Sequence, residues 1–132
     1  MTFTDNRCSG ANAIGTMVLR AETTDLIETL TISDSSFIDN SAPKGSAISS
    51  SLAVSIILSD VSIIGNETTE QDGFIFLQNH PVFERLFVTI KNGHFSENKT
   101  LNGFGGIYVQ NLITTEKSET SLKVQDSVIS NN

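Results

Sequence analysis

Four polar residues recur at equivalent places along this chain and could carry out chemistry. Asp34, Asp60, Asn92 and Asp126 each follow a branched aliphatic residue by two positions. Stacked carboxylates repel one another unless they are solvated or share a cation, and Ca²⁺ prefers carboxylate oxygens. Asp and Asn also bend the chain by bonding to their own backbone. Local turn hydrogen bonds at an exposed corner are therefore favoured, and calcium binding at Asp34, Asp60 and Asp126, or a catalytic use, is the alternative.

No other set of residues has the spacing of a catalytic or cofactor site. A catalytic carboxylate column would need a partner Arg or Lys, and neither recurs at repeated positions. His80 and His94 lie in different segments without metal-ligand spacing, and the glycine-rich segment 103–106 leads into an expected strand rather than a helix. We therefore expect no catalytic residues, no cofactor and no dedicated metal site.

The composition argues against several classes of partner. The chain has 8 Lys and Arg against 15 Asp and Glu, a formal net charge of −7, and no basic cluster. Nucleic acids and anionic membrane surfaces both require such clusters, so neither is an expected partner. No apolar run reaches the roughly 18 residues of a spanning helix, so no direct membrane insertion is expected. The single cysteine, Cys8, allows no internal disulfide and does not indicate a compartment.

The elements that position these residues follow from a nine-residue repeat. Each copy has a branched aliphatic residue at position 1, Asp or Asn at position 3, Phe or Ile at position 6 and Asn at position 9. The copies span residues 32–40, 58–66, 90–98 and 124–132, and residues 3–6 match the end of an earlier copy. A period of about 20 to 50 residues is typical of a solenoid, a propeller or an array.

Three short strands are expected in each repeat. The segment before each copy alternates apolar and polar residues, a second strand carries position 6, and a third carries an isoleucine eight or nine residues after the asparagine. Position 3 and the final asparagine are expected at corners, because Asn tolerates the left-handed backbone of a tight turn. Equivalent residues should then stack in columns about 4.8 Å apart. The predicted columns are Ile14, Ile48, Ile75 and Ile107; Phe37, Ile63, Phe95 and Ile129; and Asn6, Asn40, Asn66, Asn98 and Asn132.

These columns predict an all-β fold, a right-handed single-stranded parallel β-helix of about four coils with three short strands each and no capping repeats. A leucine-rich repeat would have a shorter period, and a propeller blade would need four strands. A β-sandwich would not repeat one motif on every crossing, and a left-handed β-helix would show hexapeptides. Residues 1–132 are expected to form a single segment, either part of a longer solenoid or a unit that stacks end to end.

Segments of variable length are predicted at one corner, over residues 20–28, 78–85 and 111–119. Insertions in a solenoid gather on one face, which is often the binding face, but surface loops also tolerate insertion at little cost in free energy. Both interpretations stay open. A polysaccharide-binding groove would need aromatic side chains, for which Phe76, Phe83 and Tyr108 are few.

The Phe-x-x-Asn elements at 3–6, 37–40 and 95–98, with the glycine-containing elements at 45–48 and 105–108, resemble repeats of the polymorphic outer-membrane protein family. The resemblance implies a right-handed β-helix of the pectate-lyase-like superfamily, displayed at a cell surface and often adhesive. We therefore expect an extracellular or cell-surface structural module that scaffolds protein contacts or adhesion and is not an enzyme. The alternative is a polysaccharide-binding or polysaccharide-cleaving module.

Overall fold

The computed structural model describes residues 1–7, 16–20, 27–51, 53–70, 73–79, 84–102, 106–112 and 117–132. Within these residues the chain is all-β, with fourteen strands and no helix. The strands form three sheets, and every pairing between the described strands is parallel. In this described part, no helix is present that could cross a membrane.

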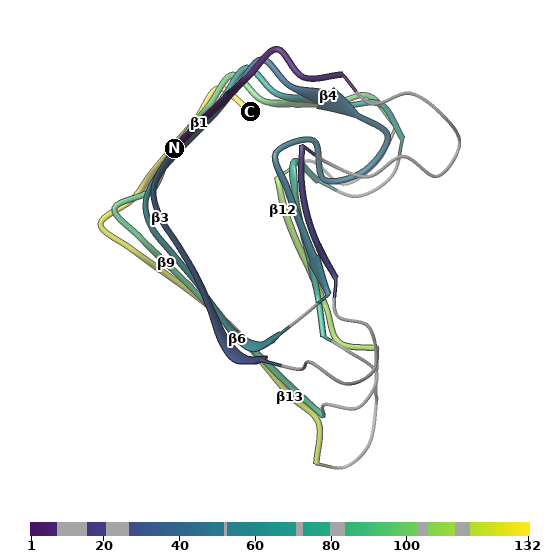
Figure 1. Ribbon diagram of the computed structural model, residues 1–132, viewed down its shortest axis with the longest axis vertical. Coiled ribbons are helices and arrows are strands. Elements are labelled where there is room, and N and C mark those ends of the chain that lie inside the picture. Colours follow the sequence, from purple (N-terminus) through teal and green to yellow (C-terminus); the bar gives the residue numbers. More distant parts are fainter. Residues whose placement is uncertain are drawn as a thin grey trace.

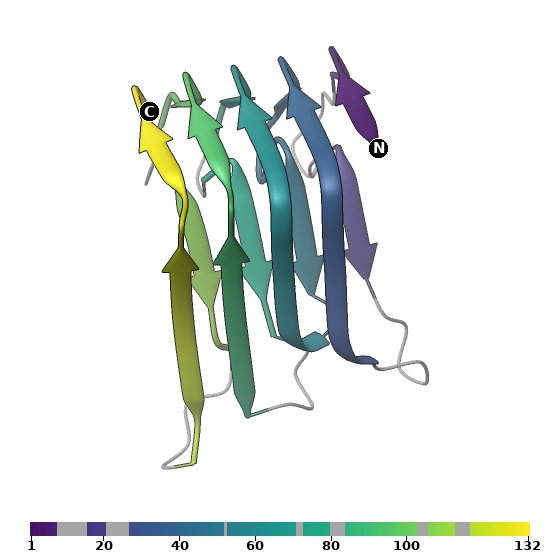
Figure 2. The same cartoon turned by 90° about the vertical axis from the view of Figure 1, so that its left-hand side faces the viewer.

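The largest sheet has seven strands and contains the repeated segments. Its strands are β1 (Thr2–Thr4), β3 (Ile27–Ile38), β6 (Ala53–Ile64), β9 (Arg85–Lys91), β10 (His94–Ser96), β13 (Glu119–Gln125) and β14 (Val128–Ser130). Figure 2 shows equivalent strands of successive repeats side by side and running in the same direction, with β9 followed end to end by β10 and β13 by β14. The predicted alternating strands are confirmed in register, because equivalent residues pair from repeat to repeat: Leu30, Ile56, Val88 and Leu122, and Ile32, Leu58, Ile90 and Val124.

Two smaller sheets complete each repeat. One consists of β4 (Ser41–Ala42), β7 (Glu67–Thr68) and β11 (Lys99–Thr100), and the other of β2 (Met17–Arg20), β5 (Ile48–Ser51), β8 (Ile75–Gln78) and β12 (Ile107–Gln110). In Figure 1, equivalent strands of successive repeats overlap, and the four-stranded sheet faces the largest sheet across the interior. The two-residue strands were not predicted, because two residues are too few to show an alternating pattern.

The core lies between the largest sheet and the four-stranded sheet, and the predicted aromatic column is part of it. Phe37, Ile63 and Phe95 are 0% exposed and pair in register, with Phe3 before them and Ile129 after them. The rings of Phe3 and Phe37 stack with their centroids 4.9 Å apart. Equivalent side chains therefore pack on one another along the whole series of repeats.

The third-strand column differs from the prediction in the first repeat. Ile48, Ile75 and Ile107 pair in register as predicted, but Met17 occupies the place opposite Ile48 that was assigned to Ile14. Ile14 lies outside the described residues. Met17 follows the repeated asparagine by eleven residues, against eight or nine in the other repeats, so variation in length is not confined to one corner. Matching isoleucine with isoleucine missed that Met fills the same kind of core position.

Ser50 is a polar residue at an inward position of β5. It is 1% exposed, pairs with Leu19 and Leu77, and its hydroxyl has no hydrogen-bond partner. A buried hydroxyl without a partner costs on the order of 1–3 kcal/mol. We therefore expect Ser50→Ala to raise the free energy of unfolding, measured in urea, by about 1 kcal/mol.

The control for this variant is Ser35→Ala. Ser35 is also buried, but its hydroxyl donates to the Ser33 carbonyl at 2.8 Å. Removing that hydroxyl should lower stability rather than raise it, because the carbonyl loses its donor. Equal destabilisation by both substitutions would contradict the assignment of an unpaired hydroxyl at Ser50.

Candidate functional site

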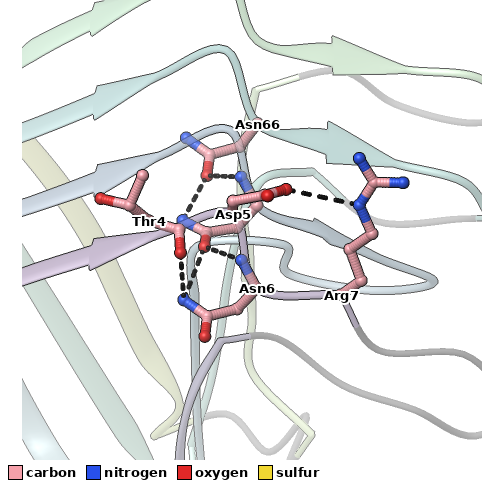
Figure 3. A network of polar contacts seen from close by, with 6 residues as sticks. Thr4, Asp5, Asn6, Arg7 and Asn66 are labelled. Atoms are coloured by element: carbon pink, nitrogen blue, oxygen red, sulfur yellow. Dashed lines mark hydrogen bonds and ion pairs between the residues drawn. The ribbon is translucent and has the colours of Figure 1, made fainter.

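The repeated asparagines form a hydrogen-bonded ladder along one corner, as predicted. Asn40, Asn66 and Asn98 are at most 2% exposed. The side-chain oxygen of each accepts two hydrogen bonds from the asparagine one repeat earlier: the backbone N–H and Nδ2 of Asn40 donate to Asn66 Oδ1 at 3.0 and 2.9 Å. The same pair of bonds links Asn6 to Asn40, Asn66 to Asn98, and Asn98 to Asn132. Figure 3 shows the first steps of the ladder around Asn6, beside the ion pair of Asp5 and Arg7.

The four asparagines after Asn6 also connect the ladder to the column of Phe3, Phe37, Ile63 and Phe95. The Asn66 Nδ2 donates to the Phe37 carbonyl at 2.9 Å, and the Asn98 Nδ2 donates to the Ile63 carbonyl at 2.8 Å. One side-chain amide therefore accepts two bonds and donates at least two, which uses its hydrogen-bonding capacity fully. No other residue type of this size provides donors and an acceptor in that geometry.

The expectation that these asparagines have the left-handed backbone conformation is wrong. The residue before each asparagine has it instead: Asp39 (φ 53°), Gly65 (φ 67°) and Glu97 (φ 59°), and likewise Asp5 and Asn131. The sequence contained this signal, because position 8 of the repeat is Asp, Gly or Asn in every copy except that of Glu97. Position 9 is Asn because of its ladder bonds, and position 8 makes the turn.

Two asparagines of the ladder, Asn66 and Asn98, begin the glycosylation sequons 66–68 and 98–100. Their side-chain amides are buried and bonded on both sides, so an attached sugar would have to break the ladder. We expect both to stay unmodified when the chain is expressed in a glycosylating host. Intact-mass measurement tests this prediction, and hexose added to either asparagine would contradict it.

The predicted polar corner is confirmed by the backbone. Asp34, Asp60, Asn92 and Asp126 are exposed and all have left-handed φ values between 48° and 56°. Ser59 Oγ donates to the Asp60 carboxylate at 2.6 Å, and Asn92 Nδ2 donates to it at 3.0 Å. These two hydrogen bonds lower the pKa of the Asp60 carboxyl below its usual value, and the bond from Ser59 has the larger effect.

The calcium alternative finds no ligand cluster at this corner. Asn92 lies between Asp60 and Asp126 in the column, so the three aspartates do not meet around one point. Across the described segments, no three His, Cys, Asp or Glu side chains are grouped so that they could hold a metal ion.

The remaining candidates are dispersed. His94 is exposed, its Nε2 lies 3.3 Å from Ser96 Oγ, and its neighbours in the column are Ser62 and Val128. His80 and Phe83 lie outside the described residues, as do most of the segments of variable length. A contact surface on those segments stays a prediction.

The outer face of the four-stranded sheet combines aromatic and amide side chains. Phe76 and Tyr108 are register partners on β8 and β12, with ring centroids 5.5 Å apart and planes 12° apart. Two residues further along the strands, Gln78 Nε2 donates to Gln110 Oε1 at 3.2 Å. Counting aromatic residues one by one missed this pairing. The signal is a recurring aromatic-aliphatic-Gln-Asn pattern at 76–79 and 108–111.

A second pair of asparagines, Asn79 and Asn111, follows the C-terminal ends of β8 and β12 and forms a shorter ladder. Asn79 is 0% exposed and its Nδ2 donates to Asn111 Oδ1, while Asn79 Oδ1 accepts from the Leu112 N–H, both at 2.6 Å. The end of each strand beside the glutamine pair is thus held in place by partly buried hydrogen bonds. The aromatic and amide pairs therefore stand on a rigid backbone, which favours a preformed surface.

Comparisons of the chain with protein-family models, with curated proteins and with solved structures found no match. The resemblance of the Phe-x-x-Asn repeats stays a sequence-based prediction. The function is therefore argued from the geometry of the described residues.

Proposed function

We propose that the chain is a right-handed parallel β-helix, a solenoid that serves as a non-enzymatic structural module of a surface or secreted protein and scaffolds protein contacts or adhesion. The observation that carries this proposal is the unbroken stacking of equivalent residues from Phe3 to Ile129 together with the asparagine ladder from Asn6 to Asn132. In a solenoid each repeat contacts only its neighbours, and such stacking is what holds it together.

The different locations of the repeated and the variable residues also support the proposal of a scaffold. The repeated apolar and asparagine positions of the inner repeats are buried, and the asparagines bond to the neighbouring repeats: Asn66 bonds to both Asn40 and Asn98. The outward positions differ from repeat to repeat, as at Ser62 and His94, which are register partners. A rigid support with a variable surface is the arrangement that repeat proteins use for binding other molecules.

Two experiments test the module. Hydrogen exchange measured by NMR should show the backbone amides of Asn40 and Asn66 exchanging as slowly as those in the strands, because each donates to a buried side-chain oxygen. Fast exchange at these amides would overturn the solenoid. Incubation with polygalacturonate and calcium should yield no unsaturated products, and their formation would overturn the non-enzymatic assignment.

We extend the proposal to the apolar edge of the last coil, which a further coil covers, supplied either by a continuation of the same solenoid or, in self-assembly, by another copy of the chain. Leu122, Val124 and Ile129 there are 46%, 42% and 55% exposed. Their register partners in the coil before are at most 1% exposed, namely Val88, Ile90 and Phe95. At the first coil, an open pocket of about 430 Å³ is lined by apolar residues, namely Met1, Met17, Leu30 and Ile32, together with the polar Thr31, Ser33, Asp34 and Ser35.

Stacking the last coil of one copy on the first coil of another is a head-to-tail contact, which gives an open series of oligomers rather than a closed dimer. Sedimentation velocity at rising concentration should show this series, and Ile129→Glu should shift it towards monomer. A chain that remains monomeric at every concentration would remove self-assembly from the proposal and leave the module itself standing.

A further inference from the structure

The outer face of the four-stranded sheet carries an aromatic pair beside an amide pair. Outward positions on β8 and β12 are half-buried, while the inward Ile75 and Leu77 are 0% exposed. Two outward columns run across the strands, aromatic at Phe76 and Tyr108 and amide at Gln78 and Gln110. On β5 the same columns continue as the hydroxyl side chains Ser49 and Ser51.

The face is bounded on one side by backbone. A Cβ built on Gly45 would lie 3.1 Å from the Phe76 Cβ and 3.2 Å from the Ser49 Cβ, so the main chain at Gly45 passes directly over these two residues. Gly45 has φ +52°, a conformation that favours glycine. The pair of Phe76 and Tyr108 therefore lies next to the main chain at Gly45 on the Phe76 side. The pair of Gln78 and Gln110 lies two residues further along the same strands.

The hydrogen-bonding groups of the amide column are only partly used. A glutamine amide has two N–H donors and an oxygen with two lone pairs, and the bond from Gln78 Nε2 to Gln110 Oε1 uses one of each. Donors and acceptors therefore remain for a ligand next to the ring edges of Phe76 and Tyr108, and Tyr108 adds a phenolic hydroxyl. Apolar and hydroxyl-binding groups side by side fit a sugar ring, which has C–H faces and a rim of hydroxyl groups.

The charge of the face decides between sugar classes. The described outward side chains of β5, β8 and β12 are uncharged, namely Ser49, Ser51, Phe76, Gln78, Tyr108 and Gln110. On β2, the register partner of Ser51 is Arg20, so this uncharged area is limited to the other three strands. The chain as a whole has a net charge of −7, which repels a polyanion such as a polyuronide.

We infer that the outer face of β5, β8 and β12 is a binding site for a neutral polysaccharide, with Phe76 and Tyr108 contacting sugar rings and Gln78 and Gln110 bonding to their hydroxyl groups. The ligand runs across the strands, because their spacing of about 4.8 Å is close to the length of one sugar unit in an extended glycan. This inference depends on the proposed solenoid for the flatness of the face, but not on its scaffolding role.

The test uses the full 132-residue chain and a panel of neutral hexasaccharides, namely β-1,4-glucan, β-1,3-glucan, β-1,4-xylan and β-1,4-mannan fragments, in isothermal titration calorimetry. At least one should bind, and Tyr108→Ala and Phe76→Ala should each weaken its affinity by about tenfold or more, through loss of the ring contact. Tyr108→Phe keeps the ring and should retain most of the affinity. Gln110→Ala should weaken binding by a smaller factor, because Gln78 remains.

The matched control is Phe87→Ala. Phe87 is also a half-buried, outward phenylalanine, but it lies on β9 in the largest sheet, opposite Ser55. This substitution should leave glycan affinity unchanged. Far-UV circular dichroism and hydrogen exchange of each variant check the fold, so that failure of the solenoid and failure of the glycan site can be told apart.

Three results would overturn the inference. The first is absence of binding to all four fragments by a chain whose exchange pattern shows the intact ladder. The second is tighter binding of oligogalacturonate than of any neutral fragment. The third is loss of affinity in Phe87→Ala equal to that in Tyr108→Ala, which would place the ligand elsewhere.

Discussion

Replacing Asn66 with alanine is expected to lower the free energy of unfolding by about 3–5 kcal/mol, because the substitution leaves several buried groups without partners. Asn66 Oδ1 accepts from the backbone N–H and the Nδ2 of Asn40, and Asn66 Nδ2 donates to Asn98 Oδ1 and to the Phe37 carbonyl. Asn40 and Asn98 are at most 2% exposed, so water cannot easily replace the lost bonds. Each buried group left unpaired costs on the order of 1–3 kcal/mol.

Urea denaturation of the purified chain measures this loss, with Asn102→Ala as the control. Asn102 is exposed and makes one side-chain hydrogen bond, from Nδ2 to the Thr69 carbonyl at 3.1 Å. Its removal should cost less than about 1 kcal/mol, because water can take over the bond. Similar losses in the two variants would show that the ladder contributes no more than a surface contact does.

Side-chain columns could be predicted from the sequence because parallel, in-register pairing gives equivalent residues of successive repeats the same environment. Equivalent positions then require side chains of similar size and polarity, and these requirements produce the nine-residue pattern. This is why the column of Phe37, Ile63, Phe95 and Ile129 and the asparagine ladder were both identified correctly. A local pattern is enough when the long-range contacts repeat with it.

The same reasoning could not decide which of two neighbouring polar residues makes the turn. Asp39 and Asn40 are both residues that tolerate a left-handed backbone, and only the hydrogen bonds of the neighbouring repeats separate their roles. Met17 was missed for a related reason, because the first repeat is longer and the register depends on its pairing with Ile48. The register between two strands depends on contacts between segments far apart in the chain, so it cannot be predicted from the residues of one strand alone.

The candidate binding face was missed because it depends on outward residues in only two of the repeats. Phe76 and Tyr108 are 32 positions apart in the chain, and a count of aromatic residues treats them as isolated. The parallel pairing of β8 and β12 makes them neighbours. Pairs across strands become visible once the register is known.

The second large effect is expected in the inward column of Phe3, Phe37, Ile63 and Phe95. Phe37→Ala is expected to lower the free energy of unfolding by about 3–5 kcal/mol, the usual range for a phenylalanine removed from a packed core. Phe37 is 0% exposed, stacks on Phe3 with ring centroids 4.9 Å apart, and lies in register with Ile63. The loss combines the transfer of the ring out of water with the cavity that neighbouring coils cannot fill, because hydrogen bonds fix their spacing.

Phe37→Leu separates these two contributions. Leucine is smaller than phenylalanine but fills much of the space, so the cavity is smaller than in Phe37→Ala and more than half of the loss should be recovered. Phe87→Ala, on the outward side of the same sheet, should cost about 1 kcal/mol, since its ring is only partly removed from water. Thermal or urea unfolding of the three variants measures the differences. If Phe87→Ala were as damaging as Phe37→Ala, the inward and outward faces of the sheet would have to be exchanged, and every column assigned above would point the wrong way.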